Sequence, residues 1–293
     1  MAAPSRSRTA LVLSGGGVRG AYEAGVVAGI VEVLGLGPGD ASPFSVFAGT
    51  SVGAINATYL AAGAHRGDLA VDGLIDLWTS LRLDVHLRFQ VRELVSVRRW
   101  LARLGVTGTT APTLGWSLLD AEPLERLVGE GIAWSALRDN VADGTVRALI
   151  VAALEVASGR TAMFSELADG VTFSLSKDPM RTVRRATINR DHVLASAAIP
   201  LLFPARRIED AYYCDGGLRF NTPLAPAIRI GVDRLVVVSV LRPGRAASRG
   251  ELGYYPDVAF LAGKLFNALL ADPIAYDLQV LERFNRLMEV LEA

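Results

Sequence analysis

The stretch LVLSGGGVRGAYEAG, residues 11–25, passes from an apolar run into closely spaced glycines and then into a longer, helix-like segment. Residues 9–14 are typical of a buried strand, and residues 18–35 carry apolar side chains at roughly helical spacing. The chain therefore begins with a strand–turn–helix unit, which favours an α/β fold. What the glycine turn binds depends on the residues that follow the next strand.

Three glycines of this turn, Gly15, Gly17 and Gly20, have the G-x-G-x-x-G spacing of a dinucleotide-binding turn. A Rossmann site also needs an acidic residue at the end of the second strand, where it binds the ribose. Asp40 stands at a suitable distance along the chain, but it lies in a turn before that strand. A dinucleotide-dependent oxidoreductase is therefore disfavoured, although it stays an alternative.

The second predicted strand, residues 43–50, runs into a G-x-S-x-G motif formed by Gly49, Ser51 and Gly53. An alanine-rich helix over residues 51–64 follows, so the motif lies on a strand-to-helix turn. This is the context of a nucleophile elbow, in which the glycines allow a tight turn that lifts the serine hydroxyl off the sheet. The N-terminal end of the following helix adds positive potential at that point.

The two turns follow neighbouring strands, so we expect a nucleophile and a loop of backbone N–H groups to lie side by side. Gly15, Gly16 and Gly17 can turn their N–H groups inward because no Cβ is in the way. Acyl transfer needs both parts, because attack of Ser51 on an ester carbonyl creates an oxyanion. The glycine turn is therefore predicted to be an oxyanion hole rather than a pyrophosphate site.

A serine nucleophile needs a base, and the sequence offers two candidates. His192 leads into an alanine-rich, helix-like stretch, and we interpret it as an ordinary polar residue at the end of an element. Asp215 follows the strand-like residues 211–214 and precedes Gly216 and Gly217. No histidine comes after Asp215, so a base taken from this region is the carboxylate itself.

The rest of the chain continues the alternation of strands and helices. Residues 146–165 predict two strands around a Ser-Gly turn, and residues 234–241 predict a late buried strand. Such apolar strands flanked by helices favour a mainly parallel or mixed central sheet covered on both faces. No linker separates the pieces, so residues 1–293 are interpreted as one domain, with residues 64–135 as a cap or insert and residues 258–293 as C-terminal helices.

The composition argues against several classes of function. The formal net charge is zero, so no overall positive field attracts nucleic acid, and we expect no nucleic-acid partner. The single cysteine, Cys214, excludes an internal disulfide and a multi-cysteine zinc site. The three histidines lack metal-binding spacing, and we predict neither a metal nor a cofactor. No signal peptide and no run of about 20 apolar residues is evident, which predicts a cytoplasmic protein.

Four blocks of the sequence resemble, in order, the bacterial patatin-like phospholipases. They are SGGGVRGAYEAGVV (14–27), GTSVGAIN (49–56), ASAAIPLLFPARRI (195–208) and YCDGGLRFNTPLAPA (213–227). The segment GWSLLDAEPLERLV (115–128) is also similar to the middle of that family, so the resemblance covers about residues 9–241.

The resemblance implies a three-layer α/β/α sandwich and an acyl hydrolase that cleaves phospholipids or lysophospholipids through an acyl-enzyme. Ser51 would be the nucleophile and Asp215 the general base, without a catalytic histidine. Residues 15–17 would form the oxyanion hole, with Arg19 bracing the loop. A malonyl-type acyltransferase is the other alternative, but that class has histidines where Thr50 and Asp215 stand here.

Residues 81–104 leave two interpretations open. Six arginines there oppose Asp84 and Glu93, an excess of four positive charges, and apolar side chains lie between them. The segment fits either peripheral contact with anionic headgroups of a membrane or a solvated helix face. The apolar residues of the C-terminal tail likewise fit either packing on the sheet or contact within a homo-oligomer.

Overall fold

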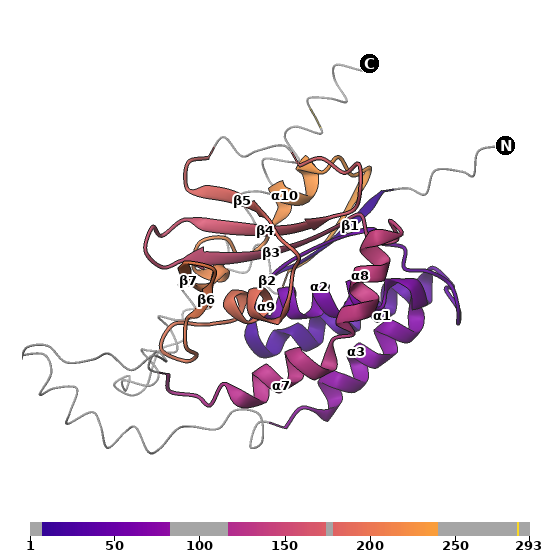
Figure 1. Cartoon of the computed structure of the whole chain (residues 1–293). Coiled ribbons are helices and arrows are strands. Elements are labelled where there is room, and N and C mark those ends of the chain that lie inside the picture. The colour runs from indigo at the N-terminus through magenta and orange to yellow at the C-terminus, as the bar shows by residue number, and fades with distance from the viewer. Residues whose placement is uncertain (1–7, 83–116, 174–177, 240–285, 287–293) are drawn as a thin grey trace, which may run out of the picture.

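The computed structural model of the chain describes residues 8–82, 117–173, 178–239 and 286, which form a sheet between helices (Figure 1). The strands are β1 (Thr9–Leu13), β2 (Val46–Thr50), β3 (Ala148–Glu155), β4 (Thr161–Leu167), β5 (Arg181–Arg185), β6 (Arg206–Ile208), β7 (Ala211–Asp215) and β8 (Arg234–Val238). The helices are α1 (Gly20–Val33), α2 (Val52–Ala62), α3 (Asp68–Ser80), α7 (Glu122–Gly131), α8 (Trp134–Ala142), α9 (Arg190–Ser196) and α10 (Leu224–Arg229). Short 3-10 turns cover η1 (Gly17–Arg19), η2 (Ala64–Arg66) and η3 (Gly216–Leu218).

The sheet is mixed, and most of its long strands are parallel. Its main path has the order β5-β4-β3-β2-β1-β8, in which β3 and β4 are antiparallel and all other neighbours are parallel. β7 pairs antiparallel with the last part of β3 and with β6. Strands β1 and β2 are buried almost throughout, because helices cover them on both sides.

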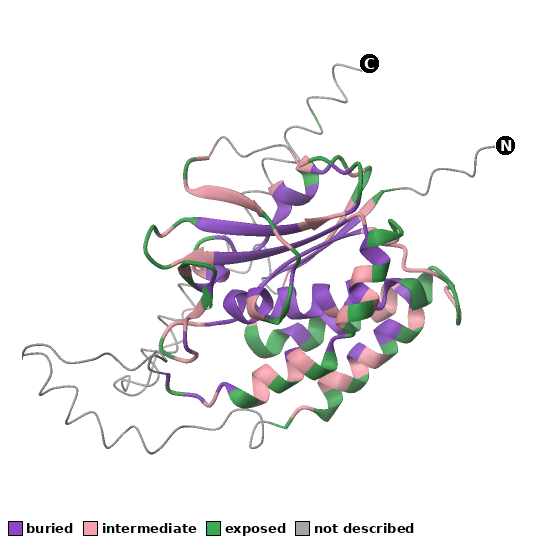
Figure 2. Cartoon of the chain, in the orientation of Figure 1, coloured by how far each residue is buried: buried purple, intermediate pink, exposed green. Residues whose placement is uncertain are grey.

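The helices form one layer on each face of the sheet. α2 packs on β1, β2 and β3, and α1, α3 and α8 lie on the same side of the sheet (Figure 1). α10 packs on β1, β2 and β8 from the opposite side. Figure 2 shows the central strands buried and the outer faces of α1, α3 and α7 exposed. This arrangement confirms the predicted α/β/α fold with a mainly parallel, mixed sheet.

The ends of β2 and β7 meet because both strands pair with one edge of β3. β4 occupies the other edge of β3 along residues 148–154, so β2 and β7 must share the remaining edge. Thr50 lies opposite Ala152, and Asp215 lies opposite the next residue of β3. The register therefore brings Ser51, the residue after β2, next to Asp215, the last residue of β7.

One strand differs from its prediction. The sequence predicts a buried strand over residues 234–241, but β8 ends at Val238, which is the one buried residue of its five. The physical reason is its position, because β8 is the outermost strand of the described sheet beside β1. Of the predicted cap, residues 83–116 lie outside the described residues. The predicted C-terminal helices over residues 258–293 also lie outside them, apart from Arg286.

Asn140 of α8 supports the end of α2 beneath the sheet. Its Nδ2 donates to the carbonyl oxygens of Ala61 at 2.9 Å and Ala62 at 3.0 Å. These carbonyls belong to the last turn of α2, where no later turn of the helix follows to supply N–H donors. The Asn140 side chain is buried, so its loss leaves both oxygens without this donor.

We expect Asn140→Ala to lower the free energy of unfolding by about 1–3 kcal/mol, because buried carbonyl groups lose their hydrogen bonds. Asp139→Ala, at the neighbouring exposed position, is the matched control. Urea unfolding followed by circular dichroism measures the difference. Equal stability of the two variants would contradict this role of Asn140.

Candidate active site

Ser51 lies on the turn between β2 and α2, as the G-x-S-x-G motif predicts. Its backbone has φ 55° and ψ −127°, a conformation that residues with a Cβ rarely adopt and that costs about 1–3 kcal/mol. The residue is only 5% exposed. The surrounding structure must therefore hold this turn in place.

Close packing of glycines provides part of that support. A Cβ on Gly49 would lie 2.2 Å from the carbonyl oxygen of Gly53, and a Cβ on Gly53 would lie 2.4 Å from the carbonyl oxygen of Leu13. A Cβ on Gly20 would lie 2.4 Å from Cγ2 of Val52. Side chains at these positions would push α1, α2 and the ends of β1 and β2 apart.

Ser196, the last residue of α9, joins the turn to β3. The N–H of Ser51 donates to Oγ of Ser196 at 2.9 Å, and this hydroxyl donates to the carbonyl oxygen of Ala152 at 2.6 Å. Ser196 is fully buried. Motif reasoning missed this residue, although it lies within the sequence block 195–208 that resembles the family.

Asp215 ends β7 and is fully buried beside Ser51. Oγ of Ser51 donates to Oδ2 of Asp215 at 2.6 Å, and the N–H of Gly217 donates to Oδ1 at 2.7 Å. Gly216 lies between Asp215 and Gly217 in the chain, and a Cβ at this position would lie 2.4 Å from the carbonyl oxygen of Ala152. Each carboxylate oxygen thus has a fixed donor, and one of these donors is the serine hydroxyl.

Burial raises the pKa of Asp215 to about 6, because the protein interior solvates the charged form poorly. The hydrogen bonds from Ser51 and Gly217 lower this pKa and limit the rise. At pH 7 the carboxylate is therefore mainly ionised and more basic than that of an ordinary aspartate. Such a group can accept a proton from a hydroxyl in contact with it.

The glycine turn after β1 lies beside Ser51, but its N–H groups are not equivalent. The N–H of Gly15 donates to the carbonyl oxygen of Asn221 at 3.1 Å, and Nδ2 of Asn221 donates to the carbonyl oxygen of Gly15 at 3.0 Å. The prediction of a free N–H at Gly15 is therefore wrong, because that group is already paired. Among the described residues, the N–H groups of Gly16 and Gly17 have no acceptor. The oxyanion-hole prediction narrows to these two groups.

Arg19 contributes to the turn through its backbone. Its N–H donates to the carbonyl oxygen of Gly16 at 3.2 Å, which closes the loop, and its side chain is exposed. The bracing role of the Arg19 side chain stays a prediction.

An apolar cavity of about 440 Å³ opens beside Ser51. Its walls come from the glycine turn, α2, α3, α7 and the segment after α9. The apolar side chains that line it include Ile55, Trp78, Leu124, Leu127 and Leu202. A cavity of this size and composition suits an apolar ligand whose polar end lies at the serine.

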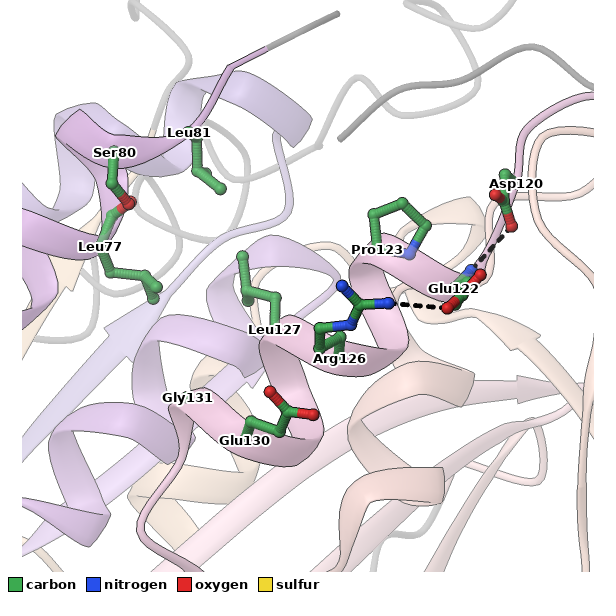
Figure 3. A pocket seen from close by; sticks show the side chains of 10 residues that line it. All are labelled: Leu77, Ser80, Leu81, Asp120, Glu122, Pro123, Arg126, Leu127, Glu130 and Gly131. Carbon is green, nitrogen blue, oxygen red and sulfur yellow. Dashed lines mark hydrogen bonds and ion pairs between the residues drawn. The ribbon is translucent and has the colours of Figure 1, made fainter. Parts of the chain in front are cut away.

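A second pocket of about 360 Å³ continues outward between α3 and α7 (Figure 3). It shares four residues with the cavity, among them Leu77 and Leu127. Its other side is polar, and there Arg126 forms an ion pair with Glu122 at 2.7 Å. Apolar surface therefore runs from Ser51 to the gap between α3 and α7, and charged side chains line the outer part.

His192 has a structural place at the start of α9. Its Nδ1 accepts from the N–H of Asn189 at 3.2 Å within a capping box, and burial lowers its pKa to about 4. This confirms its interpretation as a polar residue at the end of an element. Cys214 is buried on β7.

In the part of the chain that the structure describes, no group of three His, Cys, Asp or Glu residues could hold a metal ion. The helices of that part also lack the combination of length and apolar character that crossing a membrane requires.

The family model described as "Patatin-like phospholipase" matches residues 11–228. Among solved structures, the chain is similar to VipD from Legionella pneumophila, with a TM-score of 0.44 and 16% sequence identity over 79% of this chain. The match covers 49% of that chain, so the present chain spans about half of its length. No curated protein matches the chain. The family match includes both turns that carry Ser51 and Asp215.

The contacts of Ser196 lead to a stability prediction. Ser196→Ala should lower the free energy of unfolding by about 1–3 kcal/mol, because the buried N–H of Ser51 loses its acceptor. Ser135→Ala, at an exposed position on α8, is the control and should change the stability little. Denaturant unfolding of both variants measures the effect, and a Ser196 variant as stable as its control would argue against this bridge.

Proposed function

Since the chain belongs to the patatin-like phospholipase family, we propose that it is a serine acyl hydrolase that cleaves fatty-acyl esters of phospholipids or lysophospholipids. Ser51 is the nucleophile and Asp215 the general base. The observation that carries this proposal is the 2.6 Å hydrogen bond from Oγ of Ser51 to a buried carboxylate, at the end of an apolar cavity.

The first half of the reaction forms an acyl-enzyme. Asp215 takes the proton of the Ser51 hydroxyl through Oδ2 while Oγ attacks the ester carbonyl carbon. The carbonyl π-electrons move to oxygen, and the N–H groups of Gly16 and Gly17 stabilise the resulting oxyanion. When the carbonyl re-forms, the C–O bond to the alcohol breaks, and Asp215 returns its proton to the departing alkoxide.

The second half releases the fatty acid. A water molecule gives a proton to Asp215 and adds to the acyl carbon, which again produces an oxyanion at the glycine turn. Collapse of this intermediate breaks the bond to Ser51, and the serine oxygen recovers the proton from Asp215. Each carboxylate proton transfer is thus reversed within the same half-reaction, and the enzyme ends in its starting state.

The apolar cavity supports a lipid substrate. It places apolar side chains of α3 and α7 next to the reacting serine, where the acyl chain of the substrate would lie. We also propose that the protein is cytoplasmic and contacts the membrane peripherally through residues 81–104. Of that segment, Leu81 and Arg82 line the cavity, and the other residues lie outside the described part.

Asp215→Asn tests the dyad directly. The amide oxygen can still accept from the N–H of Gly217, and the amide NH2 group can donate to Oγ of Ser51 in a reversed hydrogen bond, so the variant should fold. The amide cannot take a proton, and turnover of a soluble ester should fall about 10²–10⁴-fold. The exposed Asp169→Asn is the control and should retain full activity. Wild-type turnover in the folded Asp215 variant would rule out the proposed base.

The raised pKa of Asp215 adds a pH dependence. Because the base must be ionised, wild-type kcat/KM should fall about tenfold per pH unit below pH 6.

The same shift affects the stability of the fold. The folded state holds the proton of Asp215 more tightly than the unfolded state, so ionisation costs stability as the pH rises from about 4 to 6. Asp215→Asn should therefore melt at least as high as wild type at pH 8. A melting temperature of the variant below that of the wild type would show that burial of the ionised Asp215 does not destabilise the protein.

Leu127→Trp tests the acyl cavity. The larger ring should fill part of the space beside Ser51 and reduce kcat/KM for long-chain esters about tenfold or more, with little change for acetyl or butyryl esters. Leu69→Trp, on the exposed side of α3, is the control. A loss that is equal for short and long chains would show that the cavity does not hold the acyl chain.

A further inference from the structure

Glu23, in the first turn of α1, is a buried carboxyl group that the proposed reaction does not use. It has no exposed surface. Nδ2 of Asn56 donates to Oε2 of Glu23 at 2.9 Å, and among the described residues Oε1 has no hydrogen-bond partner. A buried, ionised carboxylate with one oxygen unpaired is costly, whereas the protonated acid carries no net charge.

Asn56 connects Glu23 to the wall of the cavity. Its Nδ2 also donates to the carbonyl oxygen of Gly20 at 3.0 Å, and its Oδ1 accepts from Nε1 of Trp78 at 3.0 Å. Trp78 and Asn56 both line the cavity beside Ser51. The amide cannot turn over, because its NH2 group would then face the Trp78 N–H.

The same network reaches both ends of the glycine turn. Ser14 precedes the turn and interacts with the Glu23 carboxyl through its side chain and backbone. Gly20 follows the turn and binds Asn56 through its carbonyl oxygen. Glu23 therefore lies behind the loop that carries the N–H groups of Gly16 and Gly17.

Within residues 8–82, 117–173 and 178–239, no charged neighbour is among the causes that shift the pKa of Glu23. Burial is the largest cause that raises the pKa of Glu23 to about 8, and the hydrogen bonds of Asn56 and Ser14 act against it. The titratable groups on α1 and on the described elements packed against it are Arg19, Tyr22, Glu32, Tyr59, Asp68, Asp72 and Asp76. None of them is among the causes of this shift. The carboxyl is therefore mainly protonated at pH 7.

We propose that Glu23 is a positioning residue for the hydrolase site, which as a neutral acid holds the glycine turn and the Asn56–Trp78 wall and which inactivates the enzyme when it ionises. The activity part of this inference rests on the proposed function of Ser51 and Asp215. Ionisation adds a buried negative charge behind the turn that must stabilise an oxyanion, so it opposes the charge that develops in the transition state.

The test is the pH profile of kcat/KM for a soluble short-chain ester, measured on wild type, Glu23→Gln and the control Glu32→Gln. Glu32 lies on the same helix and is exposed. Wild type and the control should show an acid limb near pH 6 and an alkaline limb near pH 8. At pH 9 both should have lost about tenfold from the maximum. Glu23→Gln keeps the hydrogen-bonding shape without a titratable proton, so it should retain the acid limb and lose the alkaline one.

An unchanged alkaline limb in Glu23→Gln overturns the proposal. Infrared spectroscopy of the wild type gives a second readout that depends neither on the folding of the variant nor on activity. The carbonyl band of a protonated carboxyl should persist at pH 7 and disappear near pH 8, and its absence at pH 7 also overturns the proposal. A wild type with this band but without esterase activity at any pH would contradict the proposed function and the role of Glu23 in activity. The inference that Glu23 is a buried neutral acid would still hold.

Discussion

The pairing of two strands with one edge of β3 is the constraint on which the site depends. β2 runs parallel to the first part of β3, and β7 runs antiparallel to its last part, so their ends meet at residues 152 and 153. Ser51 and Asp215 are 164 residues apart in the chain, yet this register leaves 2.6 Å between their side-chain oxygens. A shift of one residue in either pairing would turn the side chains to the other face of the sheet. The catalytic geometry we propose is therefore a consequence of sheet topology.

Two buried carboxyl groups lie around this point, and their surroundings give them different charge states. Asp215 has a donor at each oxygen, and its pKa of about 6 leaves it ionised at neutral pH. Glu23 has an unpaired oxygen, and its pKa of about 8 leaves it protonated. Burial is the largest cause that raises both pKa values, and hydrogen bonds lower both, so the balance of the two effects separates a group suited to act as a base from one suited to hold structure.

Much of this arrangement could be predicted from the sequence, because its signals are local. The motif around Ser51 and the Asp-Gly-Gly at residues 215–217 each need only a few adjacent residues, and the apolar runs that became β1 to β4 are equally local. The supports of the site could not be found this way. Ser196 binds the turn from 145 residues away, and Asn221 pairs with Gly15 from 206 residues away. Such contacts depend on long-range register, which also explains why the expected free N–H of Gly15 is engaged.

The proposed reaction depends on activation of the Ser51 hydroxyl by the carboxylate of Asp215. The most direct measurement is mass spectrometry of the protein after reaction with a fluorophosphonate, with identification of the modified peptide in wild type and in Asp215→Asn. Activation of Ser51 by Asp215 predicts one phosphonyl adduct on Ser51 in the wild type and a much slower reaction in the folded variant. An adduct on a different serine, or equal labelling rates in both proteins, would contradict it.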